Sequence, residues 1–193
     1  MAAGMLITGA IPATADPIDT WLKNNRHQLP RTLPELAALP LEVRSAAYQE
    51  LTPAERSAAW VTQLTNHRIP TLTAEQSAVL EAALALAANP ANFAGGPAAP
   101  AAAAIAGHAT AAFGVVRARE IFATLGPSGA PTTTTAKASA AITTTAVQAT
   151  ALASCQCSTA SDYCGGHCQS GGCTPRSPGC GFLYQYTCNG HCV

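Results

Sequence analysis

The distribution of cysteine constrains this chain more than any other feature. The first 154 residues contain no cysteine, and all eight cysteines lie in residues 155–193. A segment this short cannot usually bury enough apolar surface to fold without covalent cross-links or metal ions. The spacing is C-x-C-x6-C-x3-C-x4-C-x6-C-x7-C-x3-C, which places the thiols at Cys155, Cys157, Cys164, Cys168, Cys173, Cys180, Cys188 and Cys192.

Three kinds of cysteine chemistry fit such a segment. An even number of closely spaced thiols is typical of a disulfide framework in an oxidising compartment, and we favour this interpretation. A structural zinc site is the second possibility, because His167 and His191 each lie inside a C-x3-C motif. A redox-active thiol pair is disfavoured, since the segment has no C-x-x-C motif and no β-α-β pattern.

The sequence does not select a disulfide connectivity, because eight cysteines permit 105 pairings. Cys155 and Cys157 are too close along the chain to bond one another easily, so each needs a more distant partner. Plausible partners are a cysteine of either C-x3-C motif, or Cys173 and Cys180. The alternating sequence GFLYQYTC predicts one strand over 181–188, after a turn region over 174–181.

Residues 16–126 have the pattern of a small helical bundle of four to six helices. The clearest start signal is Thr52 as N-cap, Pro53 at the first helical position and Glu55 three residues after the cap. Thr73 and Gln76 repeat the capping pair before a second apolar face. Further helical patterns lie near 16–29, 32–40, 41–51 and 115–125.

Nothing in the helical region predicts catalysis. His27, His67 and His108 are isolated, Trp21 and Trp60 lie on apolar faces, and the charged run at 117–120 is interpreted as a solvated helix face. We therefore expect no enzyme activity and no cofactor. Ten basic and ten acidic side chains leave the chain formally neutral, so its net charge does not indicate a nucleic-acid partner.

Two further segments complete the domain organisation. Residues 1–15 have an apolar run followed by Ala13-Thr14-Ala15, which resembles a signal-peptidase site, so we expect secretion. Residues 127–154 consist mostly of threonine, serine, alanine, proline and glycine, which predicts a protease-accessible linker; a loose helix over part of it is the alternative. The fold expected is mainly α: helical bundle, linker and disulfide-rich domain with little regular structure at 155–193.

The cysteine-rich segment resembles the bacteriocin fulvocin C-related family. The run CQCSTASDYC, a glycine-rich cysteine pair, SPGCG, an aromatic stretch and TCNG carry this resemblance, and LPELAALP and LTPAERSAAW resemble the helical region that precedes the cysteine-rich end in that family. The resemblance implies a secreted precursor whose C-terminal domain kills related bacteria by acting on their membranes. It also implies a processing protease and an immunity protein as partners.

On this basis we expect residues 155–193 to be an effector that contacts the membrane or envelope of a target cell. Its candidate contact residues are exposed aromatic side chains, although the same side chains could instead form the small core of the domain: Tyr163, Phe182, Tyr184 and Tyr186. The alternative function is a non-toxic secreted module that binds cell-surface sugar or protein, and a structural zinc protein is the third hypothesis.

Overall fold

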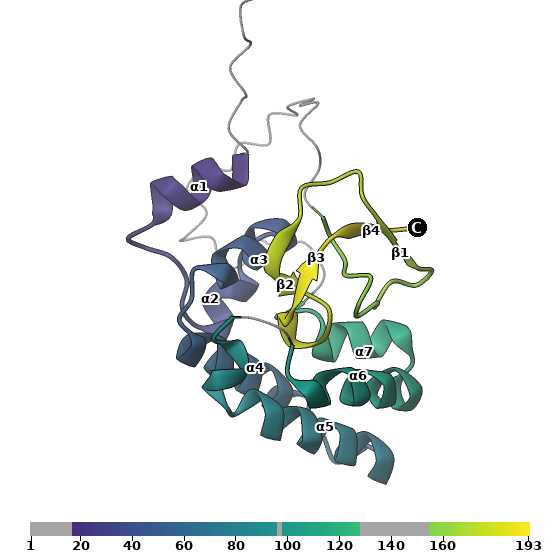
Figure 1. Cartoon of the computed structure of the whole chain (residues 1–193). Helices are drawn as coiled ribbons and strands as arrows, with labels where there is room; N and C mark the ends of the chain where they lie inside the picture. Colours follow the sequence, from purple (N-terminus) through teal and green to yellow (C-terminus); the bar gives the residue numbers. More distant parts are fainter. Residues whose placement is uncertain (1–16, 96–97, 128–154) are drawn as a thin grey trace, which may run out of the picture.

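The computed structural model describes residues 17–95, 98–127 and 155–193. Within these ranges the chain forms seven α-helices followed by a small cysteine-rich domain that lies against them (Figure 1). The prediction of a mainly α fold with a disulfide-rich C-terminal end is confirmed. The signal-like segment 1–15 and the linker beyond Pro127 lie outside the described residues.

The helices begin where the sequence places their caps. The Thr52 side chain accepts a hydrogen bond from the Glu55 amide and Thr73 accepts one from the Gln76 amide, which satisfies backbone donors that the first helical turn leaves unpaired. The helices are α1 Pro17–Asn25, α2 Leu33–Ala37, α3 Leu41–Gln49, α4 Pro53–Asn66, α5 Ala74–Ala87, α6 Pro100–Phe113 and α7 Val115–Phe122, with a 3₁₀ turn η1 at Pro90–Phe93.

Helix α6 was not among the helices that the sequence pattern predicted. Its sequence, PAAAAIAGHATAAF, has no charged residue and little contrast between faces, so amphipathic periodicity cannot reveal it. Alanine nevertheless has the highest intrinsic helix propensity, and the small side chains of Ala102 and Ala109 are buried where α6 packs on its neighbours. None of the helices that the structure describes has the length and apolarity needed to cross a bilayer.

The cysteine-rich domain contains two short antiparallel pairs. Strand β1 (Cys168–Ser170) pairs with β4 (Gly190–Cys192), and β2 (Arg176–Cys180) pairs with β3 (Tyr186–Cys188). The prediction of one strand over 181–188 is wrong, because a 3₁₀ turn, η3 at Phe182–Tyr184, interrupts it. The expected turn region over 174–181 instead contributes β2.

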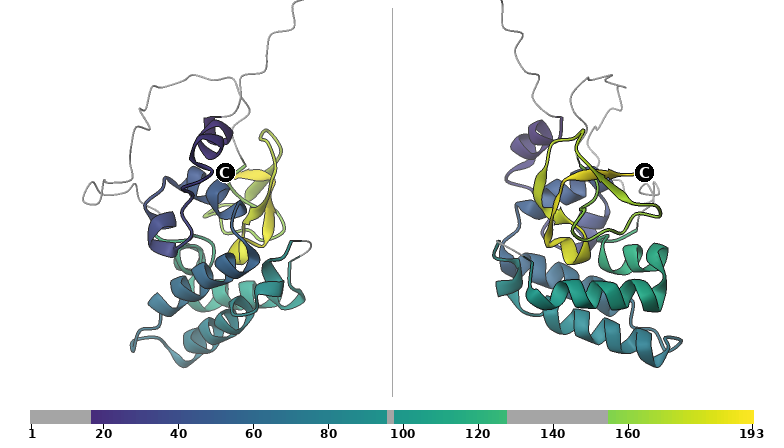
Figure 2. Two further views of the ribbon diagram at one scale, coloured as in Figure 1. Left: turned by 90° about the vertical axis from the view of Figure 1, so that its left-hand side faces the viewer. Right: turned by 45° about the vertical axis from the view of Figure 1, so that its right-hand side comes forward.

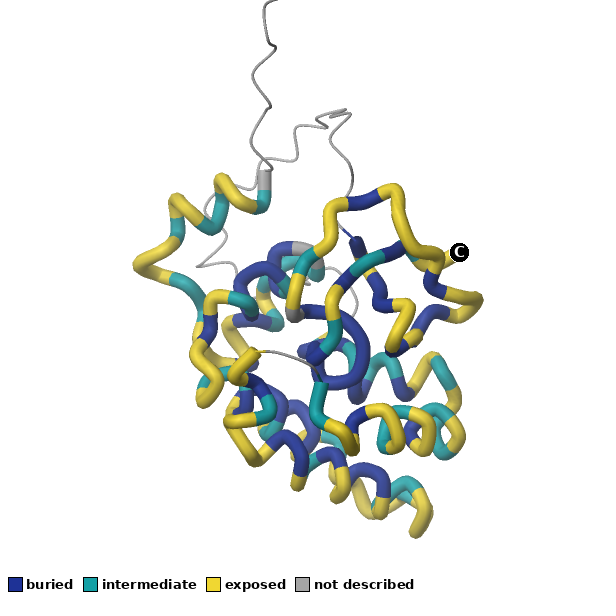
Figure 3. Tube along the Cα trace, in the orientation of Figure 1, coloured by how far each residue is buried: buried dark blue, intermediate teal, exposed yellow. Residues whose placement is uncertain are grey.

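The turn at η3 replaces a strand because its side chains enter the helical bundle. Leu183 and Tyr184 have φ values of 50° and 54°, which bend the chain sharply between β2 and β3. Phe182, Leu183 and Tyr184 belong to the same buried hydrophobic cluster as the helical core. Figure 3 shows this loop as a continuous buried stretch at the centre of the molecule, and both views in Figure 2 show the domain lying along the helices.

Candidate functional site

The cysteine-rich domain is held by four disulfides that use all eight cysteines, so the chain is disulfide-rich as predicted. The pairs are Cys155–Cys173, Cys157–Cys168, Cys164–Cys192 and Cys180–Cys188. Cys155 and Cys157 thus bond to distant partners and not to one another. Four disulfides in so small a domain indicate folding in an oxidising environment, because reducing compartments keep such thiols unpaired.

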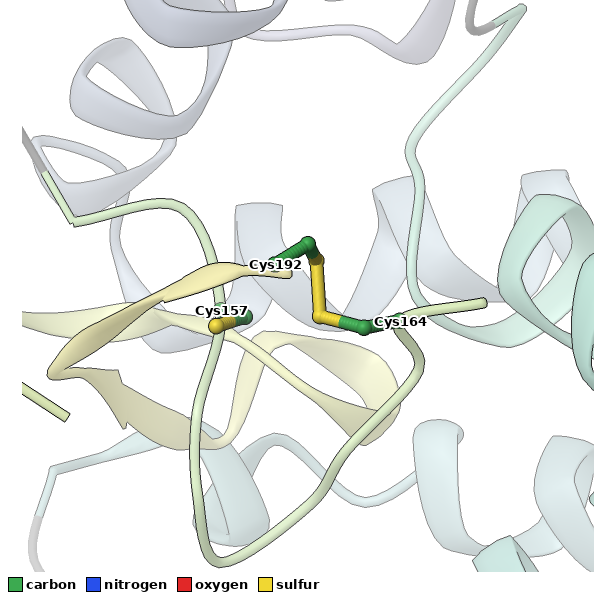
Figure 4. Close-up of side chains that lie close together, drawn as sticks. All are labelled: Cys157, Cys164 and Cys192. Carbon is green, nitrogen blue, oxygen red and sulfur yellow. A yellow bond between two sulfur atoms is a disulfide. The ribbon is translucent and has the colours of Figure 1, made fainter. Parts of the chain in front are cut away.

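Two of these bridges lie side by side. The sulfur atoms of Cys157, Cys164 and Cys192 all lie within 4.8 Å of one another, and Figure 4 shows Cys157 beside the Cys164–Cys192 bond. These sulfurs could approach a metal ion only as free thiolates, and here each is bonded to another sulfur. His167 and His191, the other candidate zinc ligands, are not part of this group.

Asp162 organises the loop that joins these bridges. One carboxylate oxygen accepts a hydrogen bond from the Cys164 amide and the other accepts one from the Cys168 amide, both at 2.7 Å. Charge-assisted bonds of this kind are stronger than those between neutral groups. Sequence reasoning did not assign Asp162 a role. Its position two residues before Cys164 is, however, typical of an aspartate that caps a tight turn.

The four aromatic residues predicted to contact a target lie mostly at the interface with the helices. Tyr163, Phe182 and Tyr184 are buried, with Phe182 0% and Tyr184 3% exposed, and Tyr186 is partly buried. The expectation that these side chains are exposed is therefore wrong for three of them in the intact chain. The buried aromatic residues do form a core, as the alternative expectation said. This core is shared with the helices, which supply most of its residues.

Aromatic contacts define how the loop is held. The Tyr184 ring meets the rings of Tyr48 and Trp60 edge to face, with centroids 5.2 and 5.3 Å apart, and Phe182 stacks on Phe122 at 5.7 Å. Such pairs add stabilisation beyond the area that they bury. Trp60 is a core residue, as its apolar face predicted.

Polar contacts fix the orientation of the domain on the helices. The Ser45 hydroxyl of α3 donates to the Gly179 carbonyl of β2, and the Ala99 amide donates to the Gln185 side chain at 3.0 Å. Gly179 has a φ of 156°, and a Cβ atom there would lie 2.7 Å from the Ser45 hydroxyl. Only glycine lets β2 approach α3 this closely. Arg176 also pairs with Asp19 of α1, at 3.3 Å.

A buried arginine connects the end of the bundle to its second and third helices. Arg44 is 1% exposed, and its guanidinium donates to four backbone carbonyls, those of Ala37, Leu39, Leu125 and Pro127. Burial lowers the pKa of Arg44, because removal from water disfavours its charged form. These four acceptors compensate for that cost and hold residues 125–127 against the start of α3.

Burial also raises the pKa of all four tyrosines. Removal from water is the main cause at each position, and it disfavours the phenolate. At Tyr184 the positive charges of Arg44 and Arg119 partly oppose this increase. The interface is therefore built from neutral phenols at any ordinary pH.

No family model, curated protein or solved structure matches this chain.

Proposed function

We propose that this protein is the precursor of a secreted bacteriocin-like antibacterial peptide, with the disulfide-bonded domain at 155–193 as its effector. The resemblance of the cysteine-rich segment to the fulvocin C-related family motivates the proposal. The observation that carries it is the complete burial of the Phe182–Tyr184 loop by the helical region. The helical region thus keeps the most apolar part of the effector covered until the helical region and the cysteine-rich domain separate.

The charge of the domain favours apolar contact with its target. Asp162 and Arg176 are the only formally charged side chains in 155–193, so attraction to anionic lipids contributes little. Once uncovered, Phe182, Leu183 and Tyr184 would present adjacent large apolar side chains on a scaffold that the Cys180–Cys188 bridge closes. A surface of this kind can insert into a membrane boundary or dock on an envelope protein.

The helical region then acts as carrier and mask, and residues 127–154 supply the segment for a processing protease. Release needs more than cleavage, because the aromatic contacts persist without a covalent link. A target membrane or envelope component would compete for the same loop. In a producing cell, an immunity protein would have to cover the loop after release.

The test uses the full oxidised chain with a specific protease sequence inserted between residues 128 and 154. The intact and cleaved forms are compared for growth inhibition of a panel of bacterial strains and for leakage of dye from lipid vesicles. We expect activity only after cleavage. A cleaved sample that has been reduced and alkylated is the matched control, because it keeps the same sequence without the bridges.

The proposal fails if the cleaved, fully oxidised chain inhibits no strain and causes no leakage, although gel filtration shows that the domain has separated. A cleaved domain that does not separate is tested again with Tyr48→Ala, which removes a ring that contacts Tyr184 from the helical side and leaves the effector loop unchanged. Binding to intact cell walls without inhibition would instead support the second candidate.

That second candidate is a non-toxic secreted module that binds a cell-surface component. The observation that favours it is the shared core, since one hydrophobic cluster includes both the helices and the cysteine-rich domain. A chain that works as one folded unit needs no cleavage. The intact, uncleaved protein would then show the binding, which the same experiment measures.

A further inference from the structure

A pocket lies between the helical region and the cysteine-rich domain. Its volume is about 280 Å³, close to the lower end of the range for small-molecule sites. One wall comes from α3 and α7 with the residues after α7, and the other comes from residues 155–164, β2 and η3. Neither part of the protein contains this pocket alone, so it exists only while the two are docked.

The pocket has a positive charge from Arg119. Arg119 of α7 and Arg176 of β2 both line it, but Arg176 is paired with Asp19 at 3.3 Å, so Arg119 supplies the charge that a ligand would meet. Arg119 is partly buried, and no hydrogen bond or ion pair joins its guanidinium to another described residue. This differs from the expectation that residues 117–120 form a solvated helix face, which holds for Arg117 but not for Arg119.

Two buried serine hydroxyls of the pocket have a proton left to donate. The Ser158 hydroxyl accepts a hydrogen bond from the Ala160 amide, and the Ser161 hydroxyl accepts one from the Phe182 amide. Each hydroxyl therefore keeps its proton for another acceptor, and both serines are buried and line the pocket. The Arg119 guanidinium and the two serine hydroxyls together suit an acceptor-rich ligand.

We propose that this pocket binds a small hydroxylated carboxylate, of the size and chemistry of a sugar acid. A guanidinium binds a carboxylate through paired, charge-assisted hydrogen bonds, and the serine hydroxyls donate to further oxygens of the ligand. Leu41 and Ala123 add apolar surface for a carbon skeleton. A free phosphate ion would satisfy the charge but leave most of the volume empty.

This site goes beyond the proposed antibacterial role and can be tested separately from it. The ligand would touch both parts of the chain, so its binding would stabilise the docked form. Glucuronate is the probe, glucose is the neutral control of the same size, and inorganic phosphate tests for charge alone. The full oxidised chain is used, with calorimetric titration and thermal unfolding as the two measurements.

We expect glucuronate to bind and to raise the melting temperature, and glucose to bind at least tenfold more weakly. Arg119→Gln should weaken glucuronate binding at least tenfold. Arg117→Gln should not, because Arg117 lies on the same helix but is exposed and paired with Glu120. The melting temperature of each variant without ligand shows whether it is folded, and Arg119→Lys, which keeps the charge, should bind with intermediate affinity.

Three results would overturn the proposal: no glucuronate binding at millimolar concentration, equal binding of glucose, or equal losses in the Arg117 and Arg119 variants. Phosphate binding without glucuronate binding would show an anion site of a different class and would also reject it. Each outcome is independent of whether the cleaved chain kills bacteria.

Discussion

Replacing Tyr184 with alanine should destabilise the helices, although Tyr184 lies in the cysteine-rich domain. Its ring is 3% exposed and contacts the rings of Tyr48 and Trp60. Removing a buried aromatic ring of this kind costs about 3 to 5 kcal/mol, from lost burial and the cavity that remains. In a chain of this length that corresponds to a decrease of about 6 to 20 °C in melting temperature.

Far-ultraviolet circular dichroism is the appropriate assay, because it follows the helices and not the domain that carries the mutation. Tyr186→Ala is the matched control, since Tyr186 follows on the same chain segment but is only partly buried. Tyr186→Ala should lower the melting temperature of the helices by less than half as much as Tyr184→Ala does. Tryptophan fluorescence supplies a second signal, because Trp60 lies directly against the deleted ring.

A different result would refute the shared core. If helix melting in Tyr184→Ala moves by no more than it does in Tyr186→Ala, the helical region is stable without the aromatic loop. The domain would then be an appendage that folds on its own bridges. The masking role proposed for the helices would lose its physical basis.

Three other predictions follow from the same contacts. Arg44→Met leaves four buried carbonyls without their donor and should lower the free energy of unfolding in urea by about 3 kcal/mol or more. Arg68→Met breaks only an exposed pair with Glu81 and should lower it by less than about 1 kcal/mol. Every tyrosine has a folded-state pKa above its unfolded value, so the stability that these residues contribute is complete below a pH of about 10 and is lost as pH rises toward the folded-state pKa values. The phenolate absorbance of the buried Tyr48, Tyr163 and Tyr184 should therefore appear together with unfolding and not before it. Replacing Cys180 and Cys188 with serine removes the bridge that closes the loop between β2 and β3. Because the bridge spans few residues, the free energy of unfolding should fall by about 2 to 3 kcal/mol, measured from the helices in the same urea experiment.

Local physical rules were enough to predict most of the helical region from its sequence. Thr52 and Thr73 begin helices because each satisfies backbone amides within three residues of itself, and such contacts need no tertiary information. Helix α6 escaped prediction because alanine forms helices without marking a buried face. Its helical state depends on intrinsic propensity and on packing against α5.

The cysteine spacing likewise determined that residues 155–193 need covalent support, because so few apolar residues cannot balance the entropy of ordering the chain. It disfavoured a bond between Cys155 and Cys157 on geometry, and the structure gives each of them another partner. It could not select among the remaining pairings, since these depend on which strands lie side by side.

Tertiary structure alone decided where the aromatic residues of the domain go. The alternation in GFLYQYTC is also compatible with a strand. The turn forms instead because the helical core surrounds Phe182 and Tyr184 with apolar side chains, and this burial offsets the strain of the positive φ values at Leu183 and Tyr184. The pocket between Arg119 and Arg176 has the same origin. Its walls are far apart in sequence, so no local pattern could have predicted it, and it exists because the domain docks on the helices.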